Sequence, residues 1–262
     1  MSHVELTIEN QVAKVTLNRP ELHNAFNEEV IKDLTNCFDT VENNHAVRVM
    51  VLQSTGKSFS AGADLNWMKK MAGYSKAENL ADAKNLAVML NKLNNLSKPS
   101  IARIQGSAFG GAVGLIACCD IAIASKLSKF CLSEVKLGLI PATISPYVVE
   151  AVGPKMAKRL FMTAEVISAR RARRINLVDE TVSEEDLDNE VDSHISNILK
   201  NGPIAVTLAK SLVDKVANQP INEAMIEQTS EMIAEVRVSD EGQEGLNAFL
   251  EKRAANWIHS HD

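Results

Sequence analysis

Two turns built from small residues and one isolated acid are the parts of this sequence best suited to chemistry. The turns are residues 59–64, Phe-Ser-Ala-Gly-Ala-Asp, and residues 110–114, Gly-Gly-Ala-Val-Gly; the acid is Glu134, in the apolar stretch 130–138. Where such a turn opens a helix, backbone N–H groups point outward without partners and stabilise an oxygen that is becoming anionic. A half-buried carboxylate has a raised pKa, which suits proton transfer near neutral pH. Together the three features could stabilise an enolate and move a proton beside it.

Each feature also has a simpler explanation. Either turn could be only a tight turn or a point of close helix packing, and Glu134 could lie on an exposed face beside Lys136. The turns do not match two other glycine motifs. A phosphate loop needs Gly-Lys-Ser or Gly-Lys-Thr after the glycines, and a dinucleotide-binding turn needs a third glycine and an acid after the next strand. The chemistry is therefore expected only if the fold brings both turns and the acid together.

The elements expected to position these residues alternate between strands and helices as far as about residue 182. Hydrophobic periodicity predicts strands at 4–8, 12–17, 47–53, 100–104 and 121–124, with loops at 54–58 and 106–110. It predicts helices at 27–41, 64–71, 76–96 and 112–118. Beyond residue 183 it predicts only helices, at 184–200, 203–217, 221–238 and 240–257. This order indicates an α/β fold with a core over residues 1–200 and a helical lobe over residues 201–262.

Composition and charge exclude several classes of partner. The chain has 262 residues, 45% of them hydrophobic and 23% charged, and its formal net charge is −5. This acidic balance argues against a general surface for nucleic acid or for an anionic membrane. No stretch is long and apolar enough to span a bilayer, and the first residues do not form a signal or transit peptide, so a cytoplasmic location is expected.

The residue types that usually hold metals or redox centres form no recognisable motif. Cys37, Cys118, Cys119 and Cys131 include no Cys-x-x-Cys pair, so buried structural thiols in a reducing compartment are expected. No metal and no redox cofactor are predicted.

Several motifs occur in order along almost the whole chain. They are Asn18-Arg-Pro-x3-Asn-Ala25, residues 59–65 (FSAGADL), Gly106-x3-Gly-Gly-x7-Cys-Asp120, residues 133–141 (SEVKLGLIP) and residues 249–253 (FLEKR). Together they resemble the signatures of the crotonase superfamily, the enoyl-CoA hydratase/isomerase family. The resemblance implies a spiral of ββα turns with a C-terminal helical lobe, assembled as a homotrimer or a dimer of trimers. It also implies an acyl-CoA thioester substrate, with coenzyme A present only as part of that substrate.

The resemblance implies a role for each of the three features. The backbone N–H groups of Ala63 and Gly111 would form the oxyanion hole for the thioester oxygen, and Glu134 matches one of the family's two catalytic glutamates. Residues 22–25 and the backbone near Ala61 would hold the adenine and pantetheine parts of CoA. The expected substrate and CoA contacts are Leu22, His23, Asn24, Ala25, Ala61, Asp64, Leu65, Trp67, Met68, Tyr147 and Lys252.

Alternatives stay open for several of these contacts. Trp67, Met68 and Tyr147 could line the acyl pocket or could belong to the core. Asp64 could cap its helix instead of binding substrate or working as a catalytic acid. Lys252 could reach the CoA phosphates, including those of a neighbouring subunit, or could be only a cationic helix end.

One position departs from the family pattern. Two-glutamate hydratases of the family have an acid where this chain has Gly114, so one carboxylate is missing and room near the reacting centre is expected. A substrate carboxylate or an ordered water could do the work of the missing acid. Residues 63–68, 110–120, 132–135 and 140–146 are similar to stretches of bacterial methylglutaconyl-CoA and isohexenylglutaconyl-CoA hydratases.

Three functions remain open at this point. The first is an acyl-CoA hydro-lyase that adds water across the double bond of a 2-enoyl-CoA, such as a substrate like 3-methylglutaconyl-CoA. The second is a Δ3,Δ2-enoyl-CoA isomerase in which Glu134 is the single proton shuttle. The third is a non-catalytic subunit that binds acyl-CoA.

Overall fold

A six-stranded sheet forms the base of the core in the computed structural model, which describes residues 3–258. Its order is β1 (Val4–Glu9), β2 (Val12–Leu17), β3 (Val49–Ser54), β5 (Ser100–Ile104), β7 (Ile121–Ser125) and β10 (Glu180–Val182). The hairpin β1–β2 is antiparallel, and every later neighbour in the sheet is parallel. The long strands match their predicted positions closely, because their hydrophobic side chains show clear periodicity.

A second, smaller sheet lies beside the first. It contains β4 (Ser58–Ser60), β6 (Ser107–Phe109), β8 (Lys129–Cys131) and β9 (Ile167–Ser168), in that order. The strands β4, β6 and β8 run parallel, and each follows one strand of the large sheet after a short connection. Helical residues then follow, so the chain repeats a strand–strand–helix unit. This repeat confirms the predicted α/β fold with a ββα spiral core.

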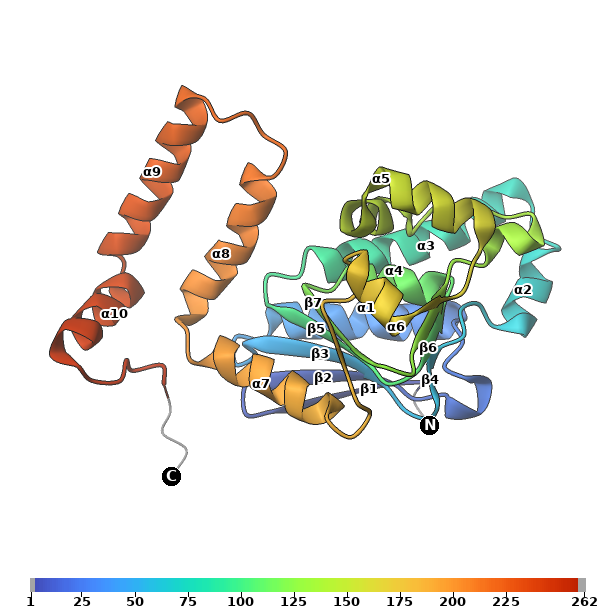
Figure 1. The fold of residues 1–262 in the computed structure, drawn as a ribbon, viewed down its shortest axis with the longest axis horizontal. Coiled ribbons are helices and arrows are strands. Elements are labelled where there is room, and N and C mark those ends of the chain that lie inside the picture. Colours follow the sequence, from blue (N-terminus) through green and yellow to red (C-terminus); the bar gives the residue numbers. More distant parts are fainter. Residues whose placement is uncertain (1–2, 259–262) are drawn as a thin grey trace.

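Helices cover both faces of the large sheet (Figure 1). The helices of the core are α1 (Glu28–Asn43), α2 (Leu65–Met71), α3 (Lys76–Asn94), α4 (Gly111–Ala117), α5 (Ser145–Thr163), α6 (Ala169–Arg174) and α7 (Leu187–Leu199), with short 3-10 helices at Pro20–Leu22 and Glu134–Leu137. The alternation of strand side chains explains the two layers. In β3, Met50 and Leu52 join the core formed with α1 and α3, whereas Val49 and Val51 pack against α7.

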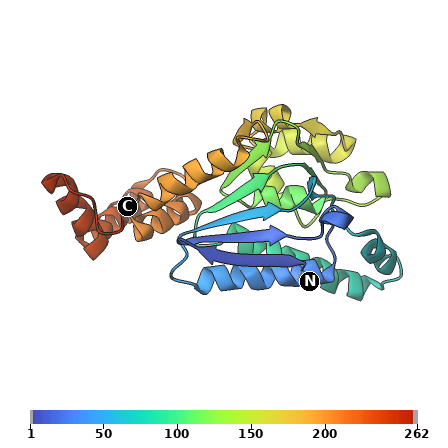
Figure 2. The ribbon, with the colours of Figure 1, turned by 90° about the horizontal axis from the view of Figure 1, so that it is seen from below.

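The C-terminal helices extend beyond the sheets as a lobe, as Figures 1 and 2 both show. The lobe consists of α8 (Pro203–Val216), α9 (Glu223–Val238) and α10 (Asp240–Glu251). Within α8 and α9, all of whose residues are described, no residue is fully buried. Lys210 of α8 ties the lobe to the core through Asp120, at 2.7 Å. The division at residues 200 and 201 into two folding units stays a prediction.

Several sequence predictions are corrected by the structure. Residues 106–110 are not all a turn, because three of them form β6, and 58–60 are a strand rather than loop. Helices α5 and α6 were not predicted at all; α5 is interrupted at Gly153, which has a φ of 76° ahead of Pro154. The last helix ends at Glu251 and not at residue 257, because Lys252 adopts a left-handed conformation with a φ of 55°. Arg253 then binds the carboxylate of Glu244 at 2.7 Å.

Two further predictions concern cysteines and membranes. All four cysteines are free thiols, and Cys118 and Cys131 are buried, as expected for structural thiols. Among residues 3–258, no helix is both long and apolar enough to cross a membrane.

Candidate active site

The topology explains how both small-residue turns and the acid come together. The turn 61–64 follows β4, Gly110 follows β6, and Glu134 comes shortly after β8. Because these three strands are adjacent and parallel, their carboxyl ends meet at one edge of the small sheet. Residues distant in sequence therefore lie side by side at this edge.

Two glycines mark where the chain segments touch. Gly62 has a φ of 90°, and a Cβ atom built on it would lie 2.9 Å from the carbonyl oxygen of Phe109. Gly110 has a φ of 55°, and a Cβ atom built on it would lie 3.3 Å from Oε1 of Glu134. Both positions need glycine, because other residues rarely adopt these dihedrals and a side chain would crowd a neighbour. The first turn thus contacts the second, and the second contacts the acid.

The hydrogen bonds around the turns leave two backbone donors free. The N–H of Phe26 donates to Gly62 O and the N–H of Asp64 donates to Phe26 O, each at 2.7 Å. These two bonds flank Ala63 and leave its own N–H without an acceptor among the described residues. The N–H of Gly110 donates to Cys131 O at 2.8 Å, and Gly111 is the first residue of α4. No acceptor within residues 3–258 takes the N–H of Ala63 or of Gly111. Ala63 is exposed and Gly111 is half-buried, so a ligand can approach both.

Phe26 holds the two turns against each other, a role that sequence reasoning missed. Its backbone makes the bridge to Ala63, and a Cβ atom built on Gly111 would lie 3.3 Å from its ring. The side chain is only 2% exposed. The position of Phe26, directly after the Asn24-Ala25 motif, was the only signal for this role in the sequence.

Glu134 is half-buried, so it does not lie on the exposed face that the simpler explanation required. Its Oε2 atom is buried and has no hydrogen-bond partner in the described part of the chain. Burial raises the pKa of Glu134 above the ordinary value for a glutamate. A raised pKa suits the proton-transfer role predicted for Glu134 beside Gly110 and Gly111.

Asp64 caps α2, as one of its two predicted roles required. Its Oδ1 accepts hydrogen bonds from the N–H of Asn66 at 2.8 Å and of Trp67 at 3.3 Å. Its Oδ2 pairs with Arg19 at 3.3 Å, and both side chains are buried. Burial alone would raise the pKa of Asp64, but the two N–H donors and Arg19 outweigh it and hold the pKa below its usual range. Asp64 is therefore ionised and structural in this arrangement.

The predicted CoA-binding loop lies beside the first turn. The N–H of Ala61 donates to the carbonyl of His23 at 2.9 Å. Asn24 accepts from the N–H of Arg19 at 2.8 Å, and Arg19 Nη1 donates to Ala25 O at 2.9 Å. Leu22, at the outer end of the loop, is 44% exposed. This rigid loop fits a ligand-binding role, which stays a prediction.

The other predicted contacts are distributed differently. Leu65 is 73% exposed next to the first turn, and Met68 is half-buried. Trp67 is only 6% exposed and donates its indole N–H to Asp82 at 3.2 Å, which favours a place in the core. Tyr147 of α5 is half-buried, and burial, together with the nearby Cys118, raises its pKa.

Lys252 does not join the other predicted residues within one chain. It directly follows α10, which lies at the far end of the lobe from β4 and β6 (Figure 1). A contact between Lys252 and CoA would therefore need a neighbouring subunit, and it stays a prediction.

The room expected at Gly114 is filled. A Cβ atom built on Gly114 would lie 2.7 Å from Cβ of Ile144, and Cγ2 of Ile144 would be closer still. Ile144 is 1% exposed at the start of α5. The prediction of an open space for a water or a substrate carboxylate at Gly114 is therefore wrong. An isoleucine of α5 occupies the volume next to the glycine.

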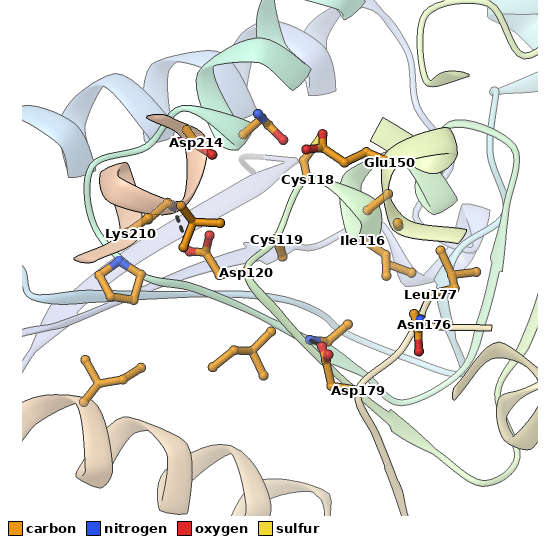
Figure 3. A pocket seen from close by; sticks show the side chains of 18 of the residues that line it. Ile116, Cys118, Cys119, Asp120, Glu150, Asn176, Leu177, Asp179, Lys210 and Asp214 are labelled. Carbon is orange, nitrogen blue, oxygen red and sulfur yellow. Dashed lines mark hydrogen bonds and ion pairs between the residues drawn. The ribbon is translucent and has the colours of Figure 1, made fainter. Parts of the chain in front are cut away.

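A cavity of about 550 Å³ lies elsewhere, between the C-terminal end of α4, β7 and α8 (Figure 3). Its acidic side chains are Asp120, Glu150, Asp179 and Asp214. Among the described residues that line it, the one basic side chain is Lys210, which is already paired with Asp120. This excess of negative charge opposes binding of the CoA phosphates. The cavity is therefore not the candidate site, despite its volume.

Comparison with known proteins agrees with this architecture. The family model described as enoyl-CoA hydratase/isomerase matches residues 7–260. A crotonyl-CoA hydratase of Syntrophomonas wolfei is 34% identical, covering 98% of each chain, and a short-chain-enoyl-CoA hydratase of Clostridium acetobutylicum is also 34% identical, covering 97% of this chain and 96% of the relative. The crystal structure of an enoyl-CoA hydratase from Shewanella pealeana superposes with a TM-score of 0.94 at 44% identity, covering 97% of this chain and 96% of that one.

The repeated strand–strand–helix units and the helical lobe define a protein of the crotonase superfamily. The match to the family model over nearly the whole chain then settles the assignment: the chain belongs to the enoyl-CoA hydratase/isomerase family.

Proposed function

We propose that the protein is a hydro-lyase that adds water across the double bond of a 2-enoyl-CoA. The observation that carries the proposal is the position of Glu134, whose Oε1 lies 3.3 Å from the Cβ position of Gly110, directly before the free N–H of Gly111. The relatives from Syntrophomonas wolfei and Clostridium acetobutylicum are hydratases of crotonyl-CoA and of short-chain enoyl-CoA, which supports hydration as the reaction.

The proposed steps follow from the three features. The thioester oxygen binds the N–H groups of Ala63 and Gly111. Glu134 takes a proton from water while the water oxygen bonds to C3, and the electron pair of the double bond moves onto the thioester oxygen as an enolate. Glu134 then returns the proton to C2. Loss of one hole donor in comparable sites costs about 3–4 kcal/mol of transition-state stabilisation, so the backbone contributes as much as the acid.

We further propose that the substrate is branched or carboxylated, like 3-methylglutaconyl-CoA. The similarity of residues 63–68, 110–120, 132–135 and 140–146 to hydratases of that kind supports this choice. Because Ile144 fills the space beside Gly114, a substrate carboxylate would act from another side of the site. In the same proposal, residues 22–25, Ala61 and Leu65 contact CoA, and the protein works as a trimer or hexamer in the cytoplasm.

The test uses a set of 2-enoyl-CoA thioesters with the wild type and Glu134→Gln. We expect loss of the absorbance of the conjugated thioester and a product heavier by one water. Glu134→Gln should bind acyl-CoA but lose most turnover. Glu150→Gln, the same change on α5 outside the site, should keep the turnover of the wild type. Near-normal hydration by Glu134→Gln would show that the assignment is wrong.

One observation favours a second candidate, a Δ3,Δ2-enoyl-CoA isomerase. Of the two described carboxylates at this edge, Asp64 is already held by the cap of α2 and by Arg19, which leaves Glu134 as the free base. One base is enough to shuttle one proton between C4 and C2. The two reactions separate in one assay, because an isomerase makes the conjugated absorbance appear from a 3-enoyl-CoA without change of mass. A non-catalytic binding subunit would change neither the absorbance nor the mass in either assay.

A further inference from the structure

A group of three potential metal ligands lies outside the proposed site. Glu180 is in β10, and Glu190 and His194 are in α7. Nε2 of His194 lies 3.3 Å from Oε1 of Glu180 and 3.6 Å from Oε1 of Glu190. The three ligand atoms all lie within 4.8 Å of one another, and all three residues are half-buried. The sequence alone does not reveal this cluster, because Glu180 belongs to a different element from the other two.

The ligand atoms are far enough apart to take an ion between them, and Nε2 of His194 is also within hydrogen-bond distance of Oε1 of Glu180. Charge-assisted hydrogen bonds between imidazolium and carboxylate are about 2.7–2.9 Å long, and a contact of 3.6 Å is outside hydrogen-bond range. Nitrogen and oxygen ligands bind Zn²⁺ at about 2.0–2.2 Å in a tetrahedron, which separates two ligand atoms by roughly 3.3–3.5 Å. The observed separations of 3.3 and 3.6 Å are close to that requirement.

The charges of the three side chains also favour a bound cation. Two carboxylates face one imidazole, and within residues 3–258 neither Glu180 nor Glu190 forms a salt bridge to a lysine or arginine. Two carboxylates beside one imidazole leave an excess of negative charge in a half-buried position, which is unfavourable. A divalent cation would neutralise both.

The ligands sit on rigid elements. Glu190 and His194 are four residues apart, so they share one face of α7. The neighbouring face of α7 is fixed by Leu187, Val191 and Ile195, which pack on the large sheet. Glu180 is held by the pairing of β10 with β7. The helix therefore presents two ligands to a third that is already in place.

We propose that Glu180, Glu190 and His194 bind one divalent transition-metal ion, with Zn²⁺ the best match and water as the remaining ligand. The ion would join the edge strand β10 to α7, the last helix before the lobe. It would stabilise the core and take no part in hydration, so the proposal is independent of the proposed function.

The test is titration of Zn²⁺ into the full-length protein after treatment with a chelator and desalting. By calorimetry, the wild type should bind one ion per chain, and Zn²⁺ should raise its Tm, because the ion binds the folded state. His194→Gln should lower the affinity by about tenfold or more and abolish the rise in Tm. His45→Gln, a matched change at an exposed histidine outside the cluster, should behave as the wild type.

Further variants test whether the carboxylates bind the ion together with the imidazole. Glu180→Gln should lose affinity as His194→Gln does, and Co²⁺ should give the visible absorption of a tetrahedral complex only in the wild type and His45→Gln. Circular dichroism spectra that match the wild type would show that the variants are folded. The proposal is overturned if the wild type binds no Zn²⁺, or if either cluster variant binds it as tightly as the wild type.

Discussion

The carboxyl group of Glu134 is held in surroundings that favour its protonated form. One oxygen is buried without a partner among the described residues, and the other lies against Gly110. The sequence singled out this residue because an acid in an apolar stretch is unusual, but only the fold shows that the side chain points toward the glycine turn.

The pH dependence of activity should reflect this environment. We expect kcat/KM for hydration to fall as the pH is lowered through the raised pKa of Glu134, because only the ionised carboxylate accepts a proton from water. Since burial raises that pKa, the fall should begin at a higher pH than for an ordinary glutamate. Initial rates across the acidic range measure it. A fall that begins only at the ordinary glutamate pKa would contradict the proposed environment.

The contact between Gly114 and Ile144 should make any side chain at residue 114 costly. We expect Gly114→Ala to lower the free energy of unfolding by about 1–3 kcal/mol, because its Cβ must displace a buried isoleucine. Gly73→Ala is the control, since a Cβ there would make only an ordinary contact of 3.5 Å with Lys70 O. Urea denaturation measures both. Equal stability of the two variants would show that Ile144 yields without cost.

At the scale of elements, sequence reasoning succeeded where periodicity is long. Strands such as β3 and β5 and helices such as α1 and α3 were predicted nearly within their bounds. The strands β4, β6 and β8 were missed because three residues are too few to show a period. Yet these three strands bring both turns and Glu134 together. The site residues were therefore predictable from composition and resemblance, whereas their convergence depends on pairing between short parallel strands.

Packing between elements was equally invisible in the sequence. The motif around Gly114 suggested a vacancy, but the start of α5 fills it with Ile144, and α5 itself was not predicted. Which side chain occupies a gap depends on an element distant in the chain, and no local pattern records it.

The pair Arg19–Asp64 links the loop 22–25 to the cap of α2 and should be a positioning pair. We expect Arg19→Met to lower the free energy of unfolding by about 3–5 kcal/mol, because it leaves the carboxylate of Asp64 buried without its partner. Arg159→Met removes an arginine from an exposed pair with Glu165 and should cost at most about 1 kcal/mol.

Urea denaturation of both variants provides the measurement. Combining Arg19→Met with Asp64→Asn should cost less than the sum of the two single changes, since the pair is coupled. Strict additivity would contradict a direct link between loop and helix cap.

At the scale of the whole molecule, the lobe exposes more apolar surface than a monomer needs. Ile221 is 89% exposed, Phe249 81% and Val238 78%, all in or beside α9 and α10. Large exposed apolar patches mark interaction surfaces. The predicted trimer or dimer of trimers would cover them and could bring Lys252 to a neighbour's substrate.

Light scattering after size exclusion tests this association. We expect a mass of about three or six chains of 28.6 kDa, because burial of the lobe's apolar side chains favours assembly. Phe249→Asp should shift the protein toward smaller species. Leu127→Asp should not, because Leu127 is 73% exposed on the α/β part of the chain, outside the lobe. A wild-type monomer would contradict the prediction.

The central claim is that an enolate forms between the N–H groups of Ala63 and Gly111, with Glu134 as the proton carrier. The most direct measurement is exchange of the C2 protons of a saturated acyl-CoA in D₂O, followed by mass spectrometry, because exchange requires the enolate but neither hydration nor isomerisation. We predict exchange with the wild type and with Glu150→Gln, and none above background with Glu134→Gln. Exchange at the wild-type rate in Glu134→Gln, or its absence in the wild type, would contradict the claim.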